Sequence, residues 1–277
     1  IKECDWSSDV CSSDLTRMPK PAPRGNIASN FASVWQSTHS QAPPAIRMII
    51  DTSDSPDHAG GNGNIASSKI FKPIGVEGAD QAASEVILAH EQVQQRMIAA
   101  NVPVRGQPTN TYFSERYRLH RFFNGEGVEV VHMASAITDG DSVVWFRGSD
   151  VIATGEIFNS DSYPQIDVDR GGSVQGLITA LEKITDLCYP EYMGQGGTMV
   201  VPGHGWISDA ADIGYYRDMV IVVRDRIQDM VDKKMTLAQV KAAKPTMDYD
   251  PLYGRTPGAT AKFVETVYRS LTEKKGN

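Results

Sequence analysis

The sequence has few cysteines, no long apolar run and no excess of positive charge. Its three cysteines, Cys4, Cys11 and Cys188, form neither an even set nor a CxxC pair, so neither a disulfide framework nor a cysteine-based zinc site is expected. No apolar segment approaches the roughly 18 residues that cross a bilayer, and the amino terminus lacks the apolar block of a secretory signal. We expect a soluble chain, and the sequence does not choose between cytoplasm and periplasm.

The charge balance excludes several classes of partner. The chain has 34 acidic and 27 basic residues, a formal charge of -7, and no basic stripe. Nucleic acid and anionic membrane surfaces are therefore poor candidates, and a small neutral or cationic substrate fits better. At 277 residues and 40% apolar composition the chain can bury a sizeable core. Nothing in the sequence indicates an oligomeric state.

The first residues differ from the rest of the chain. The stretch "IKECDWSSDVCSSDL" (1–15) contains a near-repeat of Ser-Ser-Asp without usable periodicity, and it resembles a translated sequencing adaptor. The proline-rich "TRMPKPAPRGN" that follows favours irregular structure. We therefore treat 1–25 as a disordered, non-native or linker segment and 26–277 as one domain.

From residue 26 onward, strand-like and helix-like segments alternate. Short apolar runs predict strands at 45–51, 86–89, 128–134 and 198–201, and a hairpin over 142–156 that turns at Gly148 and Ser149. Helical periodicity predicts a short helix over 26–40, one through Val93 and Met97, one from Ser173, a long helix capped by Ser208, and a last helix opened by Pro257. Interleaved strands and amphipathic helices indicate an α/β fold with helices covering sheets.

Four residues with metal-binding side chains follow predicted strands. Asp57 and His58 come after the first strand, Glu156 ends the hairpin, and His204 lies in a glycine-flanked turn after the last strand. Carboxylate and neutral imidazole are zinc ligands, and two imidazoles with one or two carboxylates complete a mononuclear site. A bound ion would lower the pKa of water and polarise a carbonyl group. Without a fold, however, spacings of about a hundred residues are a weak signal.

Three segments carry a resemblance to a known family. In order, "TSDSPDHAGGN", "HMASAITDGDSVVWFRGSDVIATGEIF" and "VPGHG" resemble the metal-binding segments of the metallo-β-lactamase superfamily. The resemblance implies a four-layer αβ/βα sandwich with a binuclear metal centre at one edge. The family pattern is His-x-His-x-Asp-His, a His before Thr-Asp-Gly, an Asp in Gly-Asp, and a His in Pro-Gly-His-Gly.

The chain departs from this pattern in one half of the implied centre. The first two histidines fall on Ser53 and Ser55, and the third falls on Ile137. A hydroxyl is a poor zinc ligand and an isoleucine has no lone pair, so we expect this half to be degenerate.

The other half keeps its ligands. Asp57, His58 and His204 match the pattern, and Glu156 replaces the bridging aspartate. The resemblance thus implies one zinc ion held by these four residues, with Asp57 also the catalytic residue. The family's first strand hairpin is not found before Phe31, so we expect a fragment that lacks its first strands and leaves a sheet edge exposed.

Three functions remain open. The favoured one is a metal-dependent hydrolase of an ester, lactone, thioester or amide that uses a single metal-bound hydroxide. The alternative is a catalytically inactive protein of this fold with a ligand-binding role, in which His58 and His204 are hydrogen-bonded rim histidines. The third is redox chemistry at iron, because two histidines and a carboxylate also describe a non-haem iron site.

Other polar residues have simpler interpretations. We expect His132 to support the core or the site, His90 to cap a helix, and Cys188 to act as a small buried apolar residue. Tyr163 and Asp167 lie in a loop where they would contact either a substrate or solvent.

Overall fold

A computed structural model describes residues 46–71, 87–119, 125–191 and 196–273. The predictions for 1–25, for a helix over 26–40 and for missing first strands therefore lie outside the described residues.

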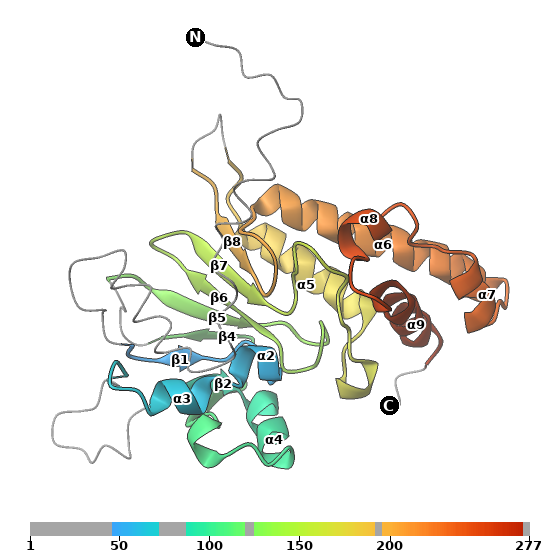
Figure 1. Cartoon of the computed structure of the whole chain (residues 1–277). Coiled ribbons are helices and arrows are strands. Elements are labelled where there is room, and N and C mark those ends of the chain that lie inside the picture. Colours follow the sequence, from blue (N-terminus) through green and yellow to red (C-terminus); the bar gives the residue numbers. More distant parts are fainter. Residues whose placement is uncertain (1–45, 72–86, 120–124, 192–195, 274–277) are drawn as a thin grey trace, which may run out of the picture.

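Two sheets form the centre of the molecule (Figure 1). The smaller one is parallel, in the order β1 (Ile49–Ile50), β2 (Ile87–His90) and β3 (Asn110–Tyr112). The larger follows chain order: β4 (Arg116–Arg118), β5 (Val128–His132), β6 (Ser142–Phe146), β7 (Val151–Gly155) and β8 (Met199–Pro202). β4 to β7 pair antiparallel, and β8 pairs parallel to β7.

Helices cover the outer face of each sheet, which gives four layers (Figure 1). α3 (Asn62–Ala66) and α4 (Glu91–Ala99) lie on the side of the small sheet. α5 (Val174–Leu187), α6 (Ala210–Asp232) and α9 (Ala259–Thr272) lie on the side of the large sheet, with the short α7 (Leu237–Ala242) and α8 (Asp250–Tyr253) beside them. Among the described helices, none is both long enough and apolar enough to cross a bilayer.

The core follows from the alternation of side chains along the strands. In β5, Val131 packs in the large core that includes α5, α6 and α9, whereas Val130 packs with Leu88 and Tyr112 of the small sheet. Successive side chains of a strand point to opposite faces, so one strand serves both the inter-sheet layer and the helix layer.

Most predicted elements are confirmed. The hairpin is β6 and β7, and the helix predicted from Ser173 is α5, which Ser173 caps and whose apolar residues are buried. The first predicted strand is shorter than expected, because only Ile49–Ile50 is in a ladder, with an isolated bridge between Ile46 and Phe71.

Two predicted helix starts are wrong. Asp209, not Ser208, caps α6, because its side chain accepts from the Ala211 and Asp212 amides. α9 begins at Ala259 after Gly258, whose φ of 81° places it in the left-handed region, so Pro257 does not open that helix.

Candidate metal centre

The two parallel strands β7 and β8 bring Glu156 and His204 to one edge of the large sheet. Both residues follow the carboxyl ends of adjacent strands, with one residue, Gly203, between Pro202 and His204. The His204 carbonyl accepts from the Ser160 amide at 3.0 Å, which ties the two strand ends together.

His58 reaches the same edge from the small sheet. After β1 the chain enters α2 (Pro56–Ala59), which carries Asp57 and His58. Proline suits this first helical turn, where the missing N–H has no helical partner. Figure 1 shows α2 beside the ends of the large sheet's strands.

His58, Glu156 and His204 converge. One ligand atom from each lies within 4.8 Å of the others. His58 Nε2 lies 3.1 Å from Glu156 Oε1, and the two imidazole rings are edge-to-face with centroids 5.7 Å apart. Asp57 is exposed and lines the adjoining cavity, but it is not part of this three-residue cluster.

The cluster fits a divalent ion of the zinc type. Two ligands at about 2.0–2.1 Å from a tetrahedral ion lie about 3.3 Å apart, close to the separation of His58 Nε2 and Glu156 Oε1. Two imidazoles and a carboxylate leave an open position for water or substrate. The donor set therefore suits a mononuclear catalytic ion, and it does not by itself distinguish zinc from iron.

The electrostatics of the cluster come from the contact between His58 and Glu156. Their hydrogen bond raises the pKa of His58 and lowers the pKa of Glu156. The Ser55 hydroxyl also hydrogen-bonds Glu156 and lowers its pKa further. Ser55 therefore orients a candidate ligand.

The remaining positions of the family pattern lie in the same cavity. It has a volume of about 200 Å³, and Ser53, Ser55, Ile137, Glu156 and His204 all contribute to its wall. The Ser53 hydroxyl, on a side chain that is almost fully buried, accepts from the Ser55 amide at 3.3 Å. Both serines have hydrogen-bonding roles, and Ile137 belongs to the hydrophobic core.

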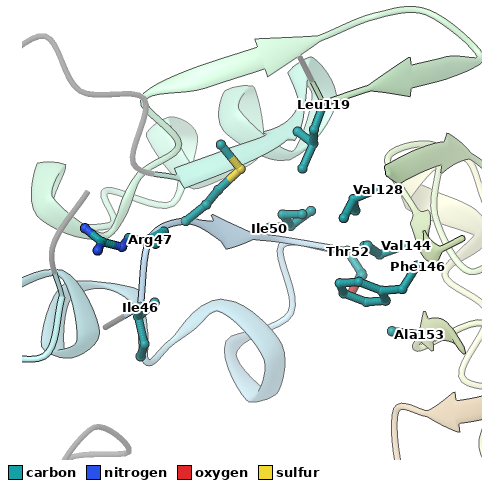
Figure 2. Close-up of a pocket in the computed structure, with 10 residues that line it drawn as sticks. Ile46, Arg47, Ile50, Thr52, Leu119, Val128, Val144, Phe146 and Ala153 are labelled. Carbon is teal, nitrogen blue, oxygen red and sulfur yellow. The ribbon is translucent and has the colours of Figure 1, made fainter. Parts of the chain in front are cut away.

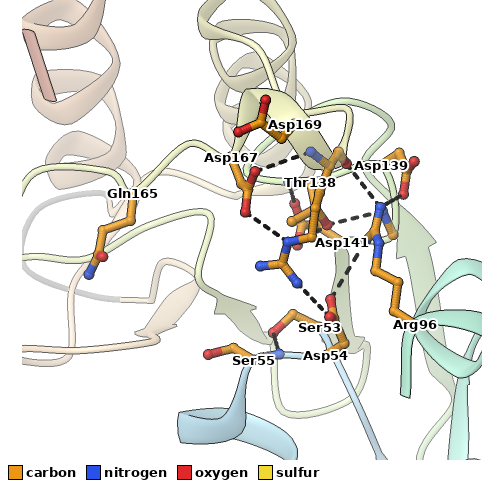
Figure 3. Close-up of polar contacts among 12 residues, drawn as sticks. Ser53, Asp54, Ser55, Arg96, Thr138, Asp139, Asp141, Gln165, Asp167 and Asp169 are labelled. Atoms are coloured by element: carbon orange, nitrogen blue, oxygen red, sulfur yellow. Dashed lines mark hydrogen bonds and ion pairs between the residues drawn. The ribbon is translucent and has the colours of Figure 1, made fainter. Parts of the chain in front are cut away.

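Sequence reasoning missed Arg170, which also lines this cavity. It ends the 3₁₀ turn η4 (Val168–Arg170), which Asp167 caps. Arg170 Nε donates to Asp167 Oδ2 at 2.8 Å, and Nη1 donates to Asp54 Oδ2 at 2.5 Å. In Figure 3, Asp167 and Asp54 lie at opposite ends of the two hydrogen bonds that join them to Arg170. Arg96 and Asp139 lie next to Asp54 and form ion pairs of their own. The i,i+3 spacing of Asp167 and Arg170 was the available signal, but Asp54 is 116 residues away.

The other polar residues are also placed. His90 caps α4, as predicted, because its Nδ1 accepts from the Gln92 amide. His132 stacks on His90 with ring centroids 3.8 Å apart. Tyr163 is buried and donates to Asp250 at 2.9 Å, so it is neither a solvated loop residue nor part of the cavity wall. Cys188 packs, half-buried, against the core.

A second cavity, of about 390 Å³, lies between β1 and the large sheet (Figure 2). Its wall includes Met48, Ile50, Val128 and Phe146, and the described residues that line it include no carboxylate, imidazole or thiol. The described lining of this second cavity therefore offers no group for acid–base or metal chemistry, unlike that of the smaller, polar cavity.

Comparison with solved structures identifies the fold. The chain superimposes on the DIM-1 metallo-β-lactamase with a TM-score of 0.50 at 14% identity, over 72% of this chain and 78% of that one. It superimposes on a double mutant of the sec-alkyl sulfatase PisA1 with a TM-score of 0.56 at 12% identity, over 86% of this chain and 42% of that one. It superimposes on a metallo-β-lactamase from Pontibacter korlensis with a TM-score of 0.48 at 16% identity, over 70% of this chain and 76% of that one.

The chain has the metallo-β-lactamase fold, as predicted. No family model matches the sequence, and no curated protein matches it.

Proposed function

We propose that this protein is a metal-dependent hydrolase that cleaves an ester, lactone, thioester or amide with a single ion. The convergence of His58, Glu156 and His204 beside a polar cavity carries this proposal. When bound, a zinc ion supplies a water of lowered pKa and a Lewis acid for the carbonyl oxygen.

Each residue of the site has a proposed role. His58, Glu156 and His204 hold the ion, and the Ser55 hydroxyl orients the Glu156 carboxylate. Asp57 lines the same cavity outside the three-residue cluster, so we assign it the proton from the attacking water. Direct ligation by Asp57 stays a prediction.

The single-ion form of the site rests on Ser53, Ser55 and Ile137. None of these side chains offers an imidazole or a carboxylate to a second ion, and both serines already have hydrogen-bonding roles. The cavity of about 200 Å³ suits a small substrate or the reacting end of a larger one.

Metal analysis of the full chain, purified without chelator, tests the proposal. We expect about one zinc ion per chain and hydrolysis of a chromogenic ester, with His204→Ala losing both. His132→Gln is the matched control, because it removes a histidine outside the cluster and should keep the zinc.

The other outcomes favour the other functions. A folded protein that takes up no metal would support the inactive, ligand-binding alternative. Bound iron with oxygen consumption would support redox chemistry instead. Two ions per native chain would overturn the single-ion form.

A further inference from the structure

Arg170 is held in the wall of the cavity that Glu156 and His204 also line. Its turn packs on the loop that contains Ile137: the Asp167 amide donates to the Ile137 carbonyl at 2.8 Å, and the Asp139 amide donates to the Arg170 carbonyl at 3.0 Å. Asp54, which receives Nη1, lies between Ser53 and Ser55 in the chain. The guanidinium therefore joins the two segments that carry the three non-ligand positions.

Only some of the N–H donors of the Arg170 guanidinium have hydrogen-bond partners among the described residues. It has five N–H donors, of which Nε binds Asp167 and Nη1 binds Asp54. Among the described residues no hydrogen bond involves Nη2, and 40% of the Arg170 side chain is exposed. Donors therefore remain for a molecule in the cavity.

The neighbouring charged residues hold the Arg170 guanidinium in place and leave some of its hydrogen-bond donors free. Arg96 shares the Asp54 carboxylate at 3.6 Å and also pairs with Asp139, so Arg170 does not neutralise Asp54 alone. Lys262, the other cation of the cavity wall, donates to Gln165 at 3.1 Å. Among the described residues that line this cavity, Arg170 is thus the cation that is anchored on two sides and still has free donors.

We propose that Arg170 donates a hydrogen bond from Nη2 to the leaving-group oxygen of an ester substrate. This inference rests on the proposed function. The oxygen of the attacking water bonds to the carbonyl carbon, the bond from that carbon to the leaving oxygen breaks, and its electron pair stays on that oxygen. The proton that the water gave to Asp57 then neutralises the leaving group, so acid and alcohol are formed from ester and water.

Arginine suits this task because it keeps its proton. Burial lowers the pKa of Arg170, but the contacts with Asp167 and Asp54 more than offset this and hold the pKa above its usual value. The residue therefore stabilises negative charge and does not act as a general acid.

The test compares two esters in the full-length chain. Arg170→Gln should lower kcat/KM for phenyl acetate, a poor leaving group, by about 10²–10³-fold. The loss for 4-nitrophenyl acetate should be much smaller, because nitrophenolate carries its own charge well. Zinc content should not change, the melting temperature should fall because Asp54 and Asp167 lose an ion-pair partner, and Arg170→Lys should restore part of the phenyl acetate activity.

A binding measurement separates this proposal from the proposed function. On the protein as purified, whatever metal it carries, Arg170→Gln should weaken binding of 4-nitrophenolate about tenfold, followed by its absorbance. Arg269→Gln is the matched control: Arg269 pairs with Asp169 of the same turn at 2.7 Å, yet it does not line the cavity. It should change neither measurement.

Equal losses for the two esters, or unchanged nitrophenolate binding, would overturn the role of Arg170 while leaving hydrolysis intact. A native chain with neither zinc nor hydrolysis would overturn the proposed function, and the binding comparison would still decide whether Arg170 contacts the anion. If Arg170→Gln does not fold, Arg170→Lys gives the same two comparisons with smaller losses.

Discussion

Glu156 reaches the two histidines because the backbone turns sharply one residue earlier. Gly155 has φ of 54°, in the left-handed region, and a Cβ there would lie 2.4 Å from Thr52 Oγ1. Because it lacks a Cβ, Gly155 allows the end of β7 to lie against Thr52, in the segment that follows β1. This close approach brings Glu156, the next residue, to the short helix α2 that carries His58. The position of Glu156, a candidate metal ligand, therefore depends on the glycine that precedes it.

Gly155→Ala should destabilise the protein by about 2–4 kcal/mol, because it combines a left-handed backbone with a clash against Thr52. It should also lower zinc content through displacement of Glu156. Denaturant unfolding and metal analysis measure the two effects. Gly125→Ala is the matched control, since Gly125 has φ of 81° with nothing within 4 Å of the added Cβ, and it should cost only about 1 kcal/mol. Equal losses would show that contact with Thr52 is not the cause.

At the scale of elements, α6 is a 23-residue helix whose first turn is closed by Asp209. Asp209 Oδ1 accepts from the amides of Ala211 and Asp212, and the Asp212 side chain accepts from the Asp209 amide at 3.4 Å. A carboxylate at this position also interacts favourably with the positive end of the helix dipole. The neighbouring Ser208 hydroxyl donates to the Trp206 carbonyl instead.

Asp209→Ala should therefore cost about 1 kcal/mol of stability, within the range of about 0.5–2 kcal/mol for lost helix caps. Ser208→Ala should cost less, because it leaves the cap intact. Urea unfolding of both variants makes the comparison. A larger loss for Ser208→Ala would restore the serine as the capping residue and contradict the structure.

Local periodicity explains which elements were predictable. α5 and the hairpin of β6 and β7 were predicted because their own residues repeat at helical or strand spacing. β3 and β4 were not, since each has three residues and exists through pairing with a neighbour. The cap of α6 was misplaced by one residue because serine and aspartate are both good caps, and only the geometry of the first turn chooses between them.

The candidate site likewise contains residues that the sequence predicted and one that it did not. The proximity of His58, Glu156 and His204 followed from the order of three sequence segments and their resemblance to one family, and the structure brings them together. The sequence offered only the spacing between Asp167 and Arg170, because the position of Arg170 in the cavity also depends on Asp54, 116 residues earlier in the chain. Side chains fixed by long-range ion pairs leave no local pattern in a sequence.

At the scale of the whole molecule, polar contacts join the two sheets between the apolar layers. The His90 ring of β2 stacks on the His132 ring of β5 at 3.8 Å, and the Tyr112 and Ser142 hydroxyls hydrogen-bond at 2.5 Å. His132 Nδ1 lies 3.1 Å from the Asp141 carbonyl. Because burial disfavours the charged form, protonation of either imidazole should weaken the stack.

Acid should therefore weaken the junction between the sheets. Burial, and then the charge of His132, lower the pKa of His90 to about 4, and burial lowers the pKa of His132 as well. A histidine with a lowered pKa binds its proton more readily in the unfolded chain, so its contribution is lost as pH falls from its ordinary pKa of about 6.5 towards about 4.

His90→Asn isolates this contribution from the other titrating groups, because asparagine can keep the cap of α4 without titrating. Between pH 7.5 and pH 5, the unfolding free energy of the native protein should fall by about 2 kcal/mol relative to that of the variant, measured in urea. His132→Asn should reduce the fall, since it removes the positive charge that opposes protonation of His90. If native protein and His90→Asn lose stability in parallel across this range, the stacked pair does not make the junction sensitive to acid.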